Sequence, residues 1–410
     1  MAKYVLFCFF VISVCTPIAL HEVLTVYSEP IPSEIGYKYW EYKFSIIHLS
    51  VIAVGFVLNV NYFYKCLIYI ILPTIFYNIL SSLITGFGIF VTSHYHMILI
   101  LLTGIGFAAI SHTLIEKMTF HRVFSYLYAV FFTTQLLRLM LNQHTDGRFA
   151  MQGLGLGETA LFNALGILYI LSKSKSHTND LFLAIVACIS LLVTGQRTII
   201  AILSFYIILR YIIMIFTFRS GQRKFYGFRR ALIYIQSVLS SQIIVFCILS
   251  LMYLAGIKFD GINFIERIMS TIYASSENLS SEYTSVGGRS LSFLVGVQLL
   301  LDFPFGIGTD FYQLQVLMQE RGYPTFPHNG MMNVYLLMSP VIMLAVIVAG
   351  LRYARFLRKG GFLLGSIPYF CLIVWSVWGG PLLNPLLVWI FMFFLTSNLL
   401  VKGNHEKRNQ

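Results

Sequence analysis

Two apolar runs separated by three residues decide the fold class of this chain. The first is Asp180–Thr194, DLFLAIVACISLLVT, and the second is Thr198–Thr217, TIIAILSFYIILRYIIMIFT, with Gly195-Gln196-Arg197 between them. An α-helix of about 20 apolar residues reaches across the hydrocarbon core of a bilayer. The stretch therefore predicts two membrane-spanning helices joined by a tight turn.

The composition extends this prediction to the whole chain. Of the 410 residues, 58% are hydrophobic and only 11% are charged, whereas about 25% are charged in a typical soluble domain. We predict an all-α polytopic membrane protein with one integral membrane domain, residues 1–401, and a short cytoplasmic tail, 402–410. About 12 transmembrane helices are expected, at 4–21, 44–62, 66–91, 95–115, 120–141, 157–172, 180–194, 198–217, 231–256, 333–351, 362–379 and 384–401.

The net charge of +12 does not indicate nucleic acid, because the basic residues gather in short segments between the predicted spans. Such segments favour the cytoplasmic side of a membrane. The basic clusters at 219–230, 352–359 and 402–408 therefore place both termini in the cytoplasm. The cysteines and histidines show no metal-ligand spacing, so we expect neither a metal nor another cofactor.

The long segment from about 257 to 332 then lies on the outer face. Residues 261–273 and 291–301 carry apolar groups at helical spacing but are too short to span. Both runs suit short helices in the membrane interface. Ser290 could cap the second of these helices, because its hydroxyl can accept hydrogen bonds from free amides of the first turn.

Three arginines lie on the predicted outer side, Arg148, Arg197 and Arg289, against the usual charge bias. A single such arginine is most simply read as a snorkelling side chain at a helix end, but three of them favour a function. The turn that holds Arg197 is so short that its guanidinium stays near the membrane boundary, where a lipid-linked phosphate would lie. Arginine binds phosphate oxygens in pairs, and Gly288 allows the backbone to approach a ligand closely.

Polar residues near these arginines could carry acid–base chemistry. His328 is the one histidine of the long outer segment, and it is a candidate for deprotonating a hydroxyl. Asn329 could hold the histidine ring or contact a sugar. Asp310, Glu320 and Glu158 could act as bases or bind a sugar, although solvated loop carboxylates are the simpler interpretation.

These motifs, in their order and approximate spacing, resemble the O-antigen ligase and Wzy-type O-antigen polymerase superfamily. The resemblance rests on Thr194-Gly195-Gln196-Arg197-Thr198 at a span start, Gly288-Arg289 opening an apolar helix, Pro304-Phe305-Gly306-Ile307-Gly308, and His328-Asn329 before a span. Arg148 with its following glycines resembles a further external motif. That motif commonly ends in Pro-Asn, where this chain has Glu158-Thr159.

The resemblance implies a metal-independent, inverting membrane glycosyltransferase with a GT-C-like architecture. Its donor would be a glycan on undecaprenyl pyrophosphate at the periplasmic face of the bacterial inner membrane. Arg197 and Arg289 would bind the pyrophosphate, and His328 would activate the acceptor hydroxyl. The residues expected to contribute to substrate binding are Arg148, Gly288, Ser290, Asn329, Asp310 and Glu158.

The expected reaction is that of an O-antigen polymerase, which transfers the growing glycan to the next lipid-linked repeat unit. The alternative is an O-antigen ligase, which transfers the glycan to lipid A–core. A lipid-linked oligosaccharide flippase is a third alternative, but its polar groups should line a path through the membrane. The expected partners are the bilayer and the lipid-linked oligosaccharide, with a chain-length regulator protein as a further candidate.

Overall fold

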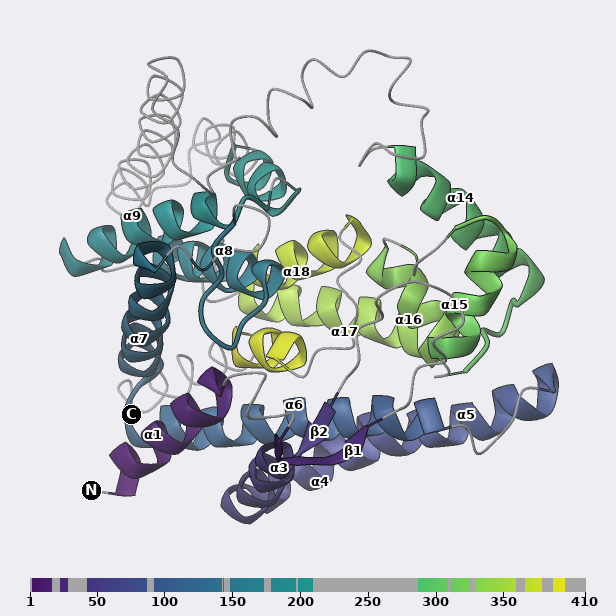
Figure 1. The fold of residues 1–410 in the computed structure, drawn as a ribbon, viewed down its shortest axis with the longest axis horizontal. Coiled ribbons are helices and arrows are strands. Elements are labelled where there is room, and N and C mark those ends of the chain that lie inside the picture. The colour runs from purple at the N-terminus through teal and green to yellow at the C-terminus, as the bar shows by residue number, and fades with distance from the viewer. Residues whose placement is uncertain are drawn as a thin grey trace. The chain divides into compact units, whose positions relative to one another are not determined.

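The computed structural model describes the chain in segments, and most of the described residues are helical (Figure 1). The described part of the chain is therefore mostly helical, as predicted, with one short pair of strands. The described residues are 2–16, 23–28, 43–86, 92–141, 143, 148–172, 178–196, 198–208, 287–308, 311–323, 327, 329–358, 366–377 and 386–394. The predicted span at 231–256, the predicted helix at 261–273 and the tail at 402–410 lie outside them.

The described helices and strands follow in chain order. They are α1 (Ala2–Cys15), β1 (Thr25–Ser28), β2 (Lys43–Ser45), α3 (Ile46–Leu58), α4 (Val60–Cys66), the π-helix η2 (Leu67–Ile71), α5 (Leu72–Thr85), α6 (Thr92–Lys117), α7 (Phe120–Met140), α8 (Leu156–Ser172), α9 (Thr178–Val193), α14 (Gly287–Asp302), α15 (Phe311–Glu320), α16 (Gly330–Met338), α17 (Pro340–Arg358) and α18 (Ser366–Val377). A further helix runs from Thr198 to Ile208.

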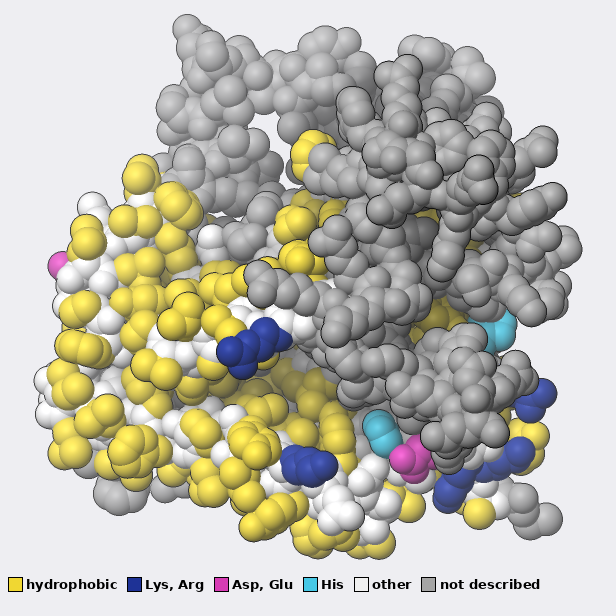
Figure 2. All heavy atoms as spheres, turned by 180° about the vertical axis from the view of Figure 1, so that it is seen from behind, with side chains coloured by type: hydrophobic (Ala, Val, Ile, Leu, Met, Phe, Trp, Pro, Cys, Tyr) yellow, Lys and Arg dark blue, Asp and Glu magenta, His cyan; other side chains and the backbone are white. Residues whose placement is uncertain are grey.

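Apolar helices indicate a membrane protein. Among the described residues, three helices are long and apolar enough to cross a bilayer, namely Val60–Thr85, Met97–Lys117 and Phe120–Met140. Large apolar side chains such as Phe76 and Leu83 are 69% exposed, which suits contact with lipid. Figure 2 shows hydrophobic side chains over much of the described surface on the face that it draws.

The chain divides into two compact units. Unit 1 comprises Met1–Val123, Ser276–Val348 and Trp375–Val401, and unit 2 comprises Phe124–Ser275, Ala349–Val374 and Lys402–Gln410. In unit 1, α3 and α6 approach closely because Gly55 and Gly106 face each other. A Cβ on Gly55 would lie 2.7 Å from the Gly106 carbonyl oxygen, so both positions require glycine.

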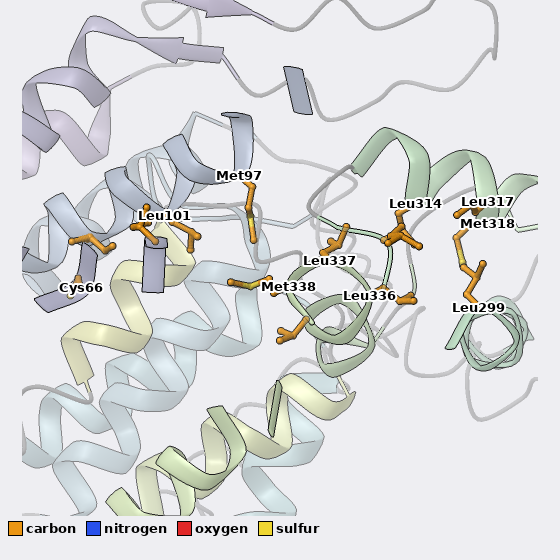
Figure 3. Close-up of a cluster of buried hydrophobic side chains, with 14 of the residues drawn as sticks. Cys66, Met97, Leu101, Leu299, Leu314, Leu317, Met318, Leu336, Leu337 and Met338 are labelled. Atoms are coloured by element: carbon orange, nitrogen blue, oxygen red, sulfur yellow. The ribbon is translucent and has the colours of Figure 1, made fainter. Parts of the chain in front are cut away.

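The three helices α14, α15 and α16 pack on one another within unit 1. Their apolar side chains join those of α4 and α6 in one buried cluster. Figure 3 shows Leu299 of α14 and Met318 of α15 pointing toward each other in that cluster. An ion pair of 2.7 Å between Arg321 and Asp302 also links the ends of α15 and α14. This cluster fixes the relative positions of the three helices that carry or flank the predicted motifs.

Two predicted span boundaries were wrong. The chain breaks at Asn59 instead of near residue 64, because the Asn59 side chain accepts a hydrogen bond from the Tyr62 amide and caps α4. Lys65 consequently lies inside a helix that continues to Thr85, and not in a loop. The predicted span 333–351 is also broken, at Ser339, where φ is +113° and α16 ends.

Two segments contain regular structure that was not predicted from the sequence. β1 and β2 form an antiparallel pair in the acidic segment after the first helix. Helix α15 lies between the predicted helix at 291–301 and the predicted span at 333–351, where no helix was predicted. Leu314, Leu317 and Met318 lie on its buried face, and their burial stabilises the helix.

Candidate functional site

Helix α14 carries the Gly288-Arg289-Ser290 motif in its first turn. The predicted Ser290 cap was wrong, because the helix begins at Gly287 and Ser290 lies within its first turn. Two turns further on, Gly296 packs against the segment that leads into α16. A Cβ on Gly296 would lie 2.7 Å from the Met332 sulfur and 3.6 Å from the Pro327 Cβ. Glycine thus allows the motif helix to lie close to the residues that flank His328.

Asn329 begins helix α16. Its side-chain oxygen accepts hydrogen bonds from the backbone amides of Met331, at 3.0 Å, and Met332, at 3.1 Å. Those amides have no partner within the helix, and an asparagine at this position typically stabilises a helix by about 1 kcal/mol. The structure therefore gives Asn329 a capping role that fixes where α16 starts.

The Pro304–Gly308 motif is a bonded turn that ties α14 to α5 and α16. The Tyr77 hydroxyl donates to the Phe305 carbonyl at 2.5 Å, and the Ile307 amide donates to the Leu336 carbonyl at 2.7 Å. Gly306 has φ +81°, and a Cβ there would lie 2.7 Å from the Tyr335 carbonyl oxygen. Only glycine suits this conformation and this space.

Unit 2 contains the predicted tight turn. Helix α9 ends at Val193 and the next helix begins at Thr198, which confirms a connection of only a few residues. Gly195 has φ +62°, and its amide donates to the Leu192 carbonyl at 3.0 Å. A left-handed glycine is a common way to end a helix.

Arg148 lies directly against this turn. A Cβ on Gly195 would lie 3.1 Å from both Cγ and Cδ of Arg148. The Phe149 amide also donates to the Val193 carbonyl at 3.3 Å. The structure therefore brings the Arg148 segment and the Gly195 turn into contact. In the sequence, the two stretches were related only because each resembles a motif of the same superfamily.

A buried polar network in unit 2 holds the Arg148 segment in place. Gln135 of α7 donates from Nε2 to the Phe149 carbonyl at 2.9 Å and accepts from the Ser190 hydroxyl on α9. Asn163 of α8 donates to Ser190 at 2.9 Å and accepts from the Tyr128 hydroxyl at 2.9 Å. Such a network rigidifies its surroundings because every broken bond would leave a buried polar group unpaired.

Glu158 stands in the first turn of α8, where its side chain folds back over Gly155. The neighbouring Thr159 hydroxyl accepts a hydrogen bond from the Met151 amide at 3.0 Å. This hydrogen bond therefore joins the stretch after Arg148 to α8, the helix that carries Glu158. Three of the predicted features, Arg148, the Gly195 turn and Glu158, belong to one local assembly.

The predicted site residues fall into three groups. Arg197, Asp310 and His328 lie outside the described residues, although the chain on both sides of each is described. The helical backbone places Gly288, Arg289 and Ser290 in unit 1 together with Asn329. Arg148 and Glu158 belong to unit 2.

Two positions of interest were not predicted from the sequence. Asn333 is a buried asparagine one turn after the Asn329 cap, and Gln135 anchors the Arg148 segment. A polar amide inside an apolar run is the signal that could have singled out both, since burying such a group without hydrogen bonds is costly.

Within the described part of the chain, no three His, Cys, Asp or Glu side chains gather as a metal site would require.

No protein-family model matches the chain, and no curated protein matches its sequence. The evidence for function is therefore the motifs and their positions within each of the two units.

Proposed function

We propose that the protein is an O-antigen polymerase. In this proposal it transfers a growing glycan from undecaprenyl pyrophosphate to a sugar hydroxyl of the next lipid-linked repeat unit. Arg289 and Arg197 bind the pyrophosphate that departs, and His328 takes the proton from the attacking hydroxyl. The reaction needs no metal, because fixed guanidinium groups neutralise the charge that develops on the leaving group.

The observation that carries the proposal is the contact of α14 with α16 and with Pro327 shortly before it. Gly296 on α14 packs against Pro327 and Met332, which stand on either side of His328 and Asn329. The helix that opens with Arg289 is therefore held against the chain that carries His328. A cation for the leaving group and a base for the nucleophile are the two groups that an inverting transfer requires.

The second unit supplies supporting evidence. The stem of Arg148 lies on Gly195, two residues before Arg197, and buried hydrogen bonds from Gln135 hold this arrangement. A rigid frame around outer-side arginines suits an anion site, because pre-positioned charges need not reorganise when substrate binds.

The finer architecture belongs to the same proposal. We infer about 12 spans in a GT-C-like arrangement, both termini in the cytoplasm, and the 257–332 segment in the periplasm. The proposed location is the inner membrane of a bacterium. The lipid-linked oligosaccharide and the bilayer are the proposed partners, with a chain-length regulator protein as an additional one.

A deletion strain tests the polymerase assignment. If it is correct, lipopolysaccharide from the strain should carry a single repeat unit, and a plasmid copy of the gene should restore the ladder of longer chains. Lipopolysaccharide without any O-antigen, together with intact polymer on the carrier, would instead identify a ligase. Loss of all periplasmic repeat units, with the lipid-linked units trapped inside, would identify a flippase.

A further inference from the structure

Helix α14 exposes large apolar side chains although it packs on α15 and α16. Leu294 is 60% exposed and Leu301 is 76% exposed, while Val295 and Leu299 of the same helix are buried. Positions seven residues apart lie on one line along an α-helix, so Leu294 and Leu301 belong to one surface. Phe305, in the turn that follows, is also 60% exposed. These three side chains form what we call the apolar face of α14.

Polar side chains occupy a neighbouring edge of the same helix. Gln298 and Asp302 are exposed, and residues four positions apart in a helix are neighbours on its surface. Asp302 also forms the 2.7 Å ion pair with Arg321. An exposed surface that divides into an apolar face and a polar edge is typical of a helix at the boundary between hydrocarbon and water.

Two hydrogen bonds join the turn after α14 to α5. The Tyr77 hydroxyl donates to the Phe305 carbonyl at 2.5 Å, and the Ser81 hydroxyl donates to the Gly306 carbonyl at 3.5 Å. Phe76, next to the first of these donors, is itself exposed. The apolar face of α14 therefore ends beside the exposed apolar surface of α5.

The length of the helix that contains α5 determines the depth of this contact. Val60–Thr85 has 26 residues and is about 39 Å long, whereas the hydrocarbon core of a bilayer is about 30 Å thick. At most about 9 Å of this helix can therefore extend beyond the core at either end. Tyr77 is about 12 Å from Thr85 along the axis. If the helix crosses the bilayer, Tyr77 lies inside the core, and Phe305 is bonded to it there.

We propose that the apolar face of α14 is embedded among the acyl chains of the bilayer leaflet that surrounds the Thr85 end of α5. Part of the 257–332 segment then lies within the membrane and not in water. Removal of Leu301 and Phe305 from water favours this insertion, and the edge with Gln298 and Asp302 remains at the headgroups. Acyl chains are the occupant because the contact with Tyr77 places the end of this face at their depth.

This surface does not depend on the polymerase assignment, because it follows from exposure and depth alone. It has a consequence for the proposed reaction all the same. Arg289 lies in the first turn of the same helix. A helix anchored in the leaflet holds this motif at the membrane that contains the lipid-linked donor.

Nitroxide spin labels measure the depth of each position. Leu294→Cys, Leu301→Cys and Phe305→Cys are each introduced into full-length protein whose native cysteines are alanine, and the labelled variants are reconstituted in liposomes. Oxygen concentrates in hydrocarbon and a nickel chelate stays in water, so their relative collision rates with the label report its depth. We expect oxygen to dominate at all three positions, as at the reference variant Phe76→Cys.

Two exposed polar positions serve as controls. Glu320→Cys, at the end of α15, should show dominance of the nickel chelate. Gln298→Cys is the matched control on α14 and should be more accessible to nickel than Leu301→Cys. Dominance of nickel at Leu294 or Leu301 would overturn the proposal. Poor access of both reagents to these two positions would show that protein covers the face, and would overturn it as well.

A photoreactive lipid tests the native protein in case the cysteine-free protein does not reach the membrane. Full-length wild-type protein is reconstituted with phosphatidylcholine that carries a diazirine in one acyl chain, and the adducts formed on irradiation are located by mass spectrometry. Adducts within 291–305 and none within 313–321 would support the proposal. Labelling of α5 without any adduct in 291–305 would contradict it. Neither measurement needs transfer activity, so failure of the polymerase assignment would leave these results unchanged.

Discussion

Replacing Gly306 by alanine should destabilise unit 1 far more than the same change at Gly322. Both glycines have φ +81°, so an alanine meets the same backbone penalty of about 1–2 kcal/mol at either position. This penalty is partly offset because alanine restricts the unfolded chain. The two sites differ only in the space available, since nothing lies within 4 Å of a Cβ at Gly322.

At Gly306 the new methyl group would meet backbone atoms that cannot move independently. It would lie 2.7 Å from the Tyr335 carbonyl oxygen and 2.8 Å from that of Leu336, and it would also meet the Tyr77 hydroxyl. Overpacking of this kind costs about 1–3 kcal/mol. Displacement of the turn would also weaken the hydrogen bonds of Phe305 and Ile307, each worth about 1 kcal/mol. We expect a total loss of about 3–5 kcal/mol at Gly306 and about 1 kcal/mol at Gly322.

Thiol labelling during thermal unfolding measures this difference. Cys66 is 8% exposed and belongs to the same buried cluster, so its reaction with a fluorogenic maleimide reports the opening of unit 1. The assay uses protein in which the other five of the six cysteines are alanine. Equal midpoints for the Gly306 and Gly322 variants would refute the reasoning from close packing.

The remaining predictions concern the proposed site and its frame. Arg197→Ala, Arg289→Ala and His328→Ala should each abolish polymer formation while membrane abundance stays at the wild-type level, and near-normal polymer would remove that residue from the site. Arg289→Lys should not restore full activity, because lysine cannot bind phosphate in a bidentate manner, whereas complete rescue would indicate a simple charge effect. Gln135→Leu should lower stability by about 2–3 kcal/mol in thermal unfolding, since it removes the donor to the Phe149 carbonyl and the acceptor of the Ser190 hydroxyl, and an unchanged midpoint would contradict that. Gly195→Ala should reduce transfer at least about tenfold by displacing the adjacent arginine stem, and normal activity would show that this contact is unimportant.

The helical class could be predicted because long apolar runs leave few alternatives. Residues 97–117 illustrate this, as an apolar run in the sequence and an apolar helix in the structure. The boundaries were less predictable, because a capping side chain decides them locally. Asn59 ends one helix and starts the next, yet apolar residues on both sides hide the break.

The break at Ser339 had a readable signal. Pro340 follows it, and proline is favoured at the first position of a helix, where its missing amide is not needed. The Ser339 hydroxyl accepts a hydrogen bond from the Ile342 amide at 3.0 Å and so caps α17. Ser-Pro inside an apolar run therefore predicts two helices instead of one.

The motifs could be found in the sequence, but their contacts could not. Nothing in the order of residues indicates that Gly296 packs against Met332, or that the Arg148 side chain packs against Gly195. Both contacts join residues more than 30 positions apart, and they depend on how whole helices pack. Sequence spacing suggested that Asn329 holds the histidine ring or contacts a sugar, and it did not reveal that the Asn329 side-chain oxygen accepts a hydrogen bond from the Met331 amide of α16.

The central claim is tested most directly with purified protein and lipid-linked repeat units in liposomes that contain no other protein. The proposal predicts that the wild-type protein converts single units into a ladder of polymers on the lipid carrier and that Arg289→Ala leaves them as single units. Repeat units that remain unchanged with the wild-type protein, or an equal ladder from Arg289→Ala, would contradict it.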